Sequence, residues 1–185
     1  TQLGRTGCRV SRLCLGTMNF GPQTSEADSF AIMDKSLDLG INFFDTADWY
    51  NRGGSERVIG RFLQGQRDDL VIATKVTLPT GEGPNRRGAS RKHIRIAVEA
   101  SLQRLGTDYL DIYYLHTPDR ETPLEETLAA LDDLVRAGKV LYVGVSNFWA
   151  WQVVRAVGLQ ELHGWDRLVV VQPLYNIANR DCEVE

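Results

Sequence analysis

Short apolar segments recur along this chain, and the stretch between each pair is long enough for one helix. Their carboxyl ends are spaced about 26 to 41 residues apart, the length of a strand, a helix and two loops. Two parallel strands need such a crossover, so the repeat predicts parallel strands that alternate with helices. The six predicted strands are Leu13–Met18, Asn42–Thr46, Leu70–Val76, Leu110–His116, Leu141–Ser146 and Leu168–Pro173.

Between the strands, the residue pattern has the period and the end signals of helices. Ser25–Leu39 is predicted to be helical, and Ser90 is predicted to cap a second helix. A third helix is predicted to start with Thr122 as its N-cap and Glu125 as the reciprocal partner in a capping box. Gly138 ends that helix, as glycines commonly do.

Two folds accommodate six such units: an open, doubly wound sheet and a closed barrel. The open sheet usually carries a glycine-rich fingerprint after its first strand, but Gly4–Gly7 is too short for one and precedes that strand. In a barrel, the carboxyl ends of all strands converge on one face, where active sites lie. A polar residue stands at or next to the carboxyl end of each predicted strand, which favours the barrel: Thr17, Asp45, Lys75, His116, Ser146 and Gln172.

We therefore predict an α/β fold, a (β/α)₈ TIM barrel, for a single domain formed by residues 1–185. A small hairpin, Leu3–Val10, is predicted to precede the first strand. A complete barrel typically needs about 250 residues, and this chain supplies only about six of the eight units. Strands seven and eight are not in the sequence, so we expect the native chain to continue.

The composition excludes several other classes of function. The net charge is −3, with basic and acidic residues interspersed, which does not fit a nucleic-acid-binding surface. No apolar run is long enough to cross a membrane. Cys8, Cys14 and Cys182 are too scattered for disulfides or a metal site, and they predict reduced thiols in a cytoplasmic protein. The sequence is compatible with a monomer and with a homo-oligomer.

Charged residues at the ends of apolar strands need an explanation. Singly, Asp45 could cap a turn, Lys75 could extend to solvent and His116 could be a buried structural histidine. Together with Tyr50, they suit one task, the donation of a proton to an oxygen. A phenol has a pKa of about 10, a nearby ammonium lowers it, and a carboxylate keeps a buried ammonium charged. A histidine beside them would orient a carbonyl by hydrogen bonding or help to tune the phenol.

Six short motifs resemble those of the aldo-keto reductase family, in the right order and over the whole chain. One position departs from the family pattern, since Leu141 stands where a basic residue is common. Six linked motifs make the resemblance more specific than any one of them. The motifs are Gly40–Tyr50, Gly54–Gly60, Ala73–Lys75, Tyr114–His116, Gly144–Phe148 and Val171–Asn176.

The resemblance implies an enzyme that reduces aldehydes or ketones to alcohols with NADPH and needs no metal. Asp45, Tyr50, Lys75 and His116 would be its catalytic residues, with Tyr50 as the proton donor. The cofactor would bind in extended form on the barrel. The residues predicted to contact it are Thr17, Met18, Asp45, Ser146, Asn147 and Gln172.

The same resemblance leaves alternatives open. Potassium-channel β subunits are similar to the same family, so a nicotinamide-binding regulatory protein with weak or no activity also fits. An inactive, truncated fragment fits as well. Phe20, Trp49 and Trp149 would lie at the same barrel end as His116, where they would either wall a substrate pocket or cover the core.

Overall fold

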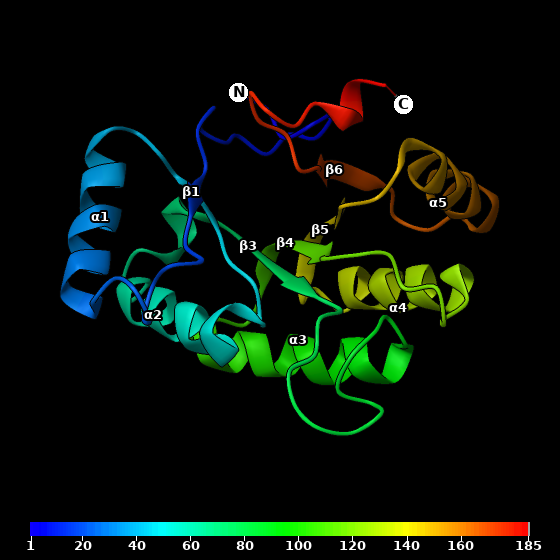
Figure 1. Ribbon diagram of the computed structural model, residues 1–185, viewed down its shortest axis with the longest axis horizontal. Coiled ribbons are helices and arrows are strands. Elements are labelled where there is room, and N and C mark those ends of the chain that lie inside the picture. The colour runs from blue at the N-terminus through cyan, green and yellow to red at the C-terminus, as the bar shows by residue number, and fades with distance from the viewer. Residues whose placement is uncertain (185) are drawn as a thin grey trace.

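The computed structural model describes residues 1–184. Within this range, six parallel strands form one sheet, and their order in the sheet follows their order in the chain. Figure 1 shows that this sheet curls. The strands are β1 (Leu15–Gly16), β2 (Phe43–Asp45), β3 (Val71–Val76), β4 (Leu110–Leu115), β5 (Val140–Ser146) and β6 (Leu168–Gln172).

Helices follow one another around the curled sheet, from the left of the view through the bottom to its right (Figure 1). Each α-helix joins two successive parallel strands. This is the arrangement of a partial (β/α)₈ barrel and confirms the predicted fold class. The helices are α1 (Glu26–Asp38), α2 (Gly54–Phe62), α3 (Arg91–Leu105), α4 (Leu124–Arg136) and α5 (Ala150–His163), with short 3-10 turns η1 (Tyr50–Gly53), η2 (Arg67–Asp69) and η3 (Asp181–Glu183).

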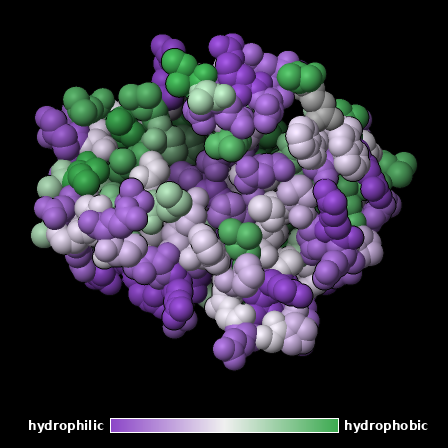
Figure 2. All heavy atoms as spheres, viewed as in Figure 1, coloured by the Kyte–Doolittle hydropathy of each residue, from purple (hydrophilic) through white to green (hydrophobic). Residues whose placement is uncertain are grey.

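The edges of the sheet are less protected than its middle. Every residue of β3 and β4 is buried, as expected for strands covered on both faces. The residues of β6, at one edge, are half-buried or exposed. At the other edge, Figure 2 shows hydrophobic residues gathered at the upper left, around α1 and β1, above a largely hydrophilic surface.

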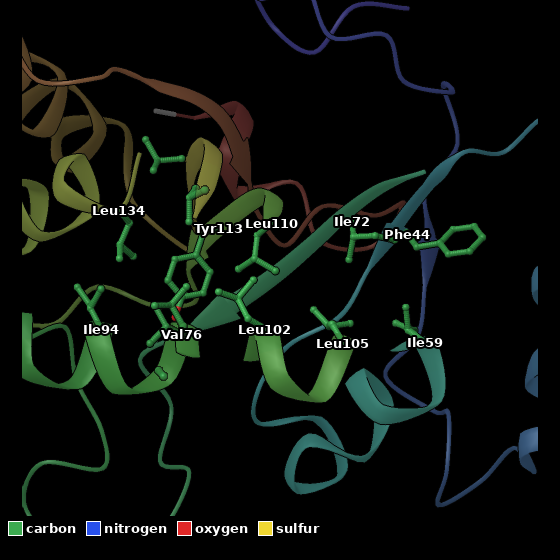
Figure 3. Close-up of a cluster of buried hydrophobic side chains, with 14 of the residues drawn as sticks. Phe44, Ile59, Ile72, Val76, Ile94, Leu102, Leu105, Leu110, Tyr113 and Leu134 are labelled. Atoms are coloured by element: carbon green, nitrogen blue, oxygen red, sulfur yellow. The ribbon is translucent and has the colours of Figure 1, made fainter. Parts of the chain in front are cut away.

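One hydrophobic cluster fills the space between the sheet and the helices. Ile59 on α2 and Leu102 on α3 point at the sheet, as Figure 3 shows. Ile72 and Tyr113 meet them from β3 and β4. Because alternate residues of a strand face opposite sides, the side chain of Lys75 on β3 points into the barrel interior.

The barrel interior has a second, smaller cluster that the N-terminal segment covers. Leu3 and Val10 pack against strand residues such as Ile112. Gln2 and Arg9 form an antiparallel bridge, which confirms the predicted hairpin. The first ten residues therefore bury apolar surface that the curled sheet would otherwise expose.

Two details of the sequence-based prediction are wrong. β1 is a strand only over residues 15–16, shorter than predicted. The predicted capping box is absent from α4, which begins at Leu124 with Pro123 as its N-cap and no side-chain cap. Thr122 Oγ1 instead donates to Asp119 Oδ2 at 2.7 Å, a contact with the preceding loop and not with the first turn of the helix.

Candidate active site

The ammonium group of Lys75 is the centre of a polar cluster near the end of β3, and its side chain is fully buried. Its Nζ donates to a carboxylate oxygen of Asp45, to the carbonyl of Thr46 at 2.8 Å and to the phenol of Tyr50 at 3.5 Å. An ammonium has three N–H donors, so each one has an acceptor here. The structure therefore brings Asp45, Tyr50 and Lys75 into contact.

Asp45, the last residue of β2, is almost entirely shielded from solvent. Burial raises the pKa of its carboxyl, while Lys75 and the side chain of Gln172 oppose that shift. The net direction is upward. The ionised form of Asp45 therefore depends on the ammonium group beside it, since an unpaired buried carboxylate is costly.

Tyr50 begins the η1 turn, whose backbone is unusual. The next two residues, Asn51 and Arg52, have φ angles of 49° and 51°, in the left-handed region that residues other than glycine rarely adopt. Such a backbone persists only where the surrounding contacts hold it in place. The turn leaves Tyr50 half-buried, with its hydroxyl directed at Lys75.

His116 follows β4 and lies edge to face against Tyr50, with ring centroids 5.7 Å apart and an interplanar angle of 83°. Burial and the positive charge of Lys75 lower the pKa of His116 to about 4. The imidazole is therefore neutral at pH 7, with one N–H donor and one acceptor nitrogen. All four predicted catalytic residues thus lie together.

Three of the residues predicted to contact a cofactor lie at neighbouring strand ends. Ser146 Oγ donates to the carbonyl of Gln172 at 2.9 Å, which ties the end of β5 to that of β6. Asn147 Nδ2 donates to the carbonyl of His116 at 2.9 Å and to Ser146 Oγ at 3.0 Å. These hydroxyl and amide groups offer the donors and acceptors that a carboxamide requires.

The remaining two predicted cofactor contacts, Thr17 and Met18, differ in exposure. Thr17 is fully buried, and its hydroxyl lies 2.9 Å from the carbonyl of Asp45, to which it donates. Met18 is 58% exposed. Thr17 therefore holds the end of β1 against β2, whereas Met18 presents an open side chain next to it.

The three aromatic residues predicted at this end of the barrel have different surroundings. Phe20 is 3% exposed and belongs to the main hydrophobic cluster, which favours the core-covering interpretation for this residue. Trp49 and Trp149 are about half exposed. Trp149 and Leu174 line an apolar groove of about 590 Å³ between α5 and the segment after β6.

Comparison with known proteins decides the family. The profile of the Aldo/keto reductase family matches residues 12–185. The chain belongs to this family. The match covers all the strands and helices and includes every residue of the polar cluster around Lys75.

Known relatives of this aldo/keto reductase chain agree with the assignment. The uncharacterised oxidoreductase YrpG of Bacillus subtilis is 48% identical over all of this chain and 60% of its own length. The norsolorinic acid reductase stcV of Emericella nidulans is 41% identical over 97% of this chain and 50% of its own length. A probable voltage-gated potassium channel subunit beta of Arabidopsis thaliana is 40% identical over 96% of this chain and 55% of its own length. The chain therefore spans half to three fifths of the length of these relatives.

None of the helices in residues 1–184 combines the length and the hydrophobicity that a membrane-spanning helix needs. In the same residues, no group of three His, Cys, Asp or Glu side chains could hold a metal ion.

Two buried polar residues at the start of α2, Ser55 and Glu56, had no role in the sequence-based prediction. Glu56 on α2 is fully buried, and its carboxylate accepts from the hydroxyl of Thr74 at 2.6 Å and from Arg104 Nε at 2.5 Å. The neighbouring Ser55 is equally buried. Helical spacing could have predicted the burial of both residues. Glu56 and Ser55 stand three and four residues before the apolar Ile59, on the side of α2 that faces the core.

Replacing Asp48 by asparagine is expected to remove a pH dependence of stability. Burial and the charge of Glu56 raise the pKa of Asp48 to about 8, although Arg104, the Trp49 backbone and Lys75 lower it. At pH 7 the folded state therefore holds a proton that the unfolded state, with a pKa of about 3.9, has released. The stability that the folded state gains by holding this proton is fully present below about pH 3.9 and is lost as the pH rises towards 8.

Urea denaturation at about pH 4 and pH 8 measures the effect of Asp48→Asn. From about pH 4 to pH 8, the free energy of unfolding of the variant should rise relative to that of wild type by on the order of a few kcal/mol. Asp34→Asn, at an exposed position on α1, is the matched control and should differ from wild type by the same amount at both. An equal difference at both pH values for Asp48→Asn would contradict the raised pKa.

Proposed function

We propose that the complete protein reduces aldehydes or ketones to alcohols, with Tyr50 as the proton donor. The observation that carries this proposal is the contact of the buried Lys75 with Asp45 and Tyr50, beside a neutral histidine. The similarity to a protein named norsolorinic acid reductase supports it. NADPH, when bound, would supply the hydride that reaches the carbonyl carbon.

The phenol of Tyr50 would give its proton to the carbonyl oxygen. As the proton leaves, negative charge develops on the phenol oxygen, 3.5 Å from Lys75 Nζ. The ammonium stabilises that charge strongly, because Lys75 has no contact with solvent. Asp45 in turn balances the ammonium, which would be costly to bury without a counterion.

His116 would orient the carbonyl oxygen within reach of Tyr50. A neutral imidazole has one N–H for this purpose. Burial of the ring, and then the positive charge of Lys75, both oppose its protonation and lower the pKa of His116. The edge-to-face packing of the two rings keeps the imidazole of His116 beside Tyr50.

Ser146, Asn147 and Gln172 would hold the carboxamide of the nicotinamide ring, and Thr17 and Met18 would flank the cofactor. The support is the chemistry of the groups at the ends of β5 and β6, a hydroxyl and two amides. Because Asn147 also donates to the backbone of His116, the cofactor-binding edge is joined to the catalytic cluster.

One observation favours a second candidate function, a regulatory subunit. Two plant relatives at 39% and 40% identity are named probable voltage-gated potassium channel subunit beta. In that case the protein would bind a nicotinamide cofactor, turn over slowly or not at all, and act on a partner protein. The contact of Tyr50 with Lys75 serves proton transfer directly, which makes the reductase the first candidate.

An assay of NADPH absorbance decay on the complete protein tests the reductase. 4-Nitrobenzaldehyde and a panel of other aldehydes and ketones serve as substrates, and we expect turnover that requires both carbonyl and NADPH. A parallel assay with NADH should give a lower kcat/KM. If the protein binds NADPH and turns over none of the carbonyls, the reductase is overturned in favour of the regulatory alternative.

A further inference from the structure

We propose that Ser55 is a positioning residue, which acts through Thr17 and Thr46 to hold Tyr50 and Lys75 at the separation that proton transfer needs. This inference rests on the proposed reductase function. It concerns a residue outside the predicted catalytic and cofactor-binding sets. Ser55 is the second residue of α2, and none of its surface is exposed.

The hydroxyl of Ser55 lies within hydrogen-bond distance of three oxygen atoms from two strand ends. Its Oγ is 2.8 Å from Thr17 Oγ1, 2.9 Å from the Thr17 carbonyl and 2.9 Å from Thr46 Oγ1. Thr17 follows β1, Thr46 follows β2, and both are fully buried. A single hydroxyl on α2 therefore joins the ends of two strands.

The protons of this cluster can be assigned. Ser55, Thr17 and Thr46 have one hydroxyl proton each, and Thr17 Oγ1 also lies 2.9 Å from the carbonyl of Asp45. Every proton has its own acceptor if Thr46 donates to Ser55, Ser55 donates to Thr17, and Thr17 donates to the Asp45 carbonyl. Ser55 is the middle member of this series of hydrogen bonds, so removal of its hydroxyl breaks the bond to Thr46 and the bond to Thr17.

The chain of hydroxyls ends on backbone that supports the catalytic cluster. Lys75 Nζ donates to the carbonyl of Thr46 and to the carboxylate of Asp45, the residue whose carbonyl Thr17 engages. Tyr50 lies between Thr46 and Ser55 in the sequence. Residues 47–54, which we call the Tyr50 segment, join Thr46 to Ser55. The hydroxyl of Ser55 therefore holds the C-terminal end of this segment against the end of β2, where the Thr46 carbonyl accepts from Lys75.

The Tyr50 segment needs contacts that hold it in place, because its backbone conformation is unfavourable. Residues 51 and 52 both have left-handed φ angles, and such a backbone persists only where the surrounding contacts hold it in place. Without the Ser55 hydroxyl, the proton of Thr46 has no acceptor in the cluster, and a buried unsatisfied donor is costly. We expect the segment to relax and to carry the hydroxyl of Tyr50 away from Lys75.

Ser55→Ala in the complete protein tests the proposal through carbonyl reduction. We expect kcat to fall about tenfold or more, since a displacement of about 1 Å can cost on the order of 10²-fold. KM for the carbonyl should stay within about twofold, because the substrate-binding groups remain. The pH profile of kcat should shift as well, because Tyr50 would lose its fixed distance to Lys75. Ser29→Ala, at a fully buried serine on α1, is the matched control and should keep the wild-type kcat.

A second pair of variants separates the hydroxyl from the bulk of a side chain. Thr46→Val keeps the volume of residue 46 and removes its hydroxyl, so it should reproduce the loss of kcat. Thr46→Ser keeps the hydroxyl and removes a methyl group, so it should retain most of the wild-type rate. If Ser55→Ala fails to fold, the comparison of Thr46→Val with Thr46→Ser still tests whether these hydroxyls position Tyr50 and Lys75.

A crystal structure of Ser55→Ala provides a result that does not depend on activity. The distance from Tyr50 Oη to Lys75 Nζ should exceed the 3.5 Å of the intact site. An unchanged distance, or a wild-type kcat and pH profile in Ser55→Ala and Thr46→Val, would overturn the positioning role. A wild-type protein without turnover would instead refute the proposed function, and the crystal structure would still decide the role of Ser55.

Discussion

Tyr50→Phe is expected to lower kcat for carbonyl reduction by about 10²- to 10⁴-fold, the range that general acid catalysis supplies. Phenylalanine keeps the ring that packs against His116 and removes only the hydroxyl at 3.5 Å from Lys75. The carbonyl oxygen would then have to take its proton from water or from another side chain. Because the binding groups remain, KM should change little, and the loss should fall on kcat.

The measurement is steady-state reduction of a carbonyl that the wild-type protein turns over, with NADPH saturating. Tyr109→Phe is the matched control, because Tyr109 precedes β4 at the opposite end of the strand from His116 and donates to Asp68 at 3.3 Å. It should keep the wild-type kcat. A Tyr50→Phe variant with a rate within a fewfold of wild type would show that another group gives the proton.

Glu56→Gln is expected to destabilise the protein by ~3–5 kcal/mol, the usual effect of breaking a buried ion pair from one side. Glu56 is fully buried, and the side chain of its partner Arg104 is only 18% exposed. Helices α2 and α3 are in close contact here, since a Cβ on Gly60 would lie 2.4 Å from the carbonyl oxygen of Arg104. The guanidinium is therefore left in a tight interface without its counterion.

Urea denaturation of the complete protein measures this loss. Glu26→Gln is the control, because Glu26 forms a comparable ion pair with Arg61 while both side chains are about half exposed. Such a pair contributes ~0–1 kcal/mol. The double variant Glu56→Gln, Arg104→Met should lose less stability than the sum of the two single variants. If Glu56→Gln is no more harmful than Glu26→Gln, the buried pair contributes nothing to stability.

Much of the fold and the polar cluster around Lys75 could be predicted because their signals are local. The spacing of apolar segments set the parallel strands, since a crossover helix has a minimum length. Asp45, Lys75 and His116 could be assigned to one place because the carboxyl ends of parallel strands meet on one face. In the structure Lys75 contacts Asp45, and His116 packs against Tyr50, which in turn contacts Lys75.

Other features depend on partners that only folding brings near. Thr122 has the residue type of an N-cap, but its hydroxyl donates to Asp119 in the preceding loop, and the helix starts one residue later. Phe20 could have walled a pocket or covered the core, and its burial in the main cluster followed from the positions of α1 and α2.

The sequence by itself determined the parallel repeat and the placing of Asp45, Lys75 and His116 at one end of the barrel, because period and strand-end position are readable along the chain. Only the tertiary structure decided the roles of Ser55 and Glu56. In the sequence they are two polar residues at the start of a helix. Their partners Thr17, Thr46 and Arg104 lie up to 48 residues away, and burial and hydrogen bonding exist only once these residues meet.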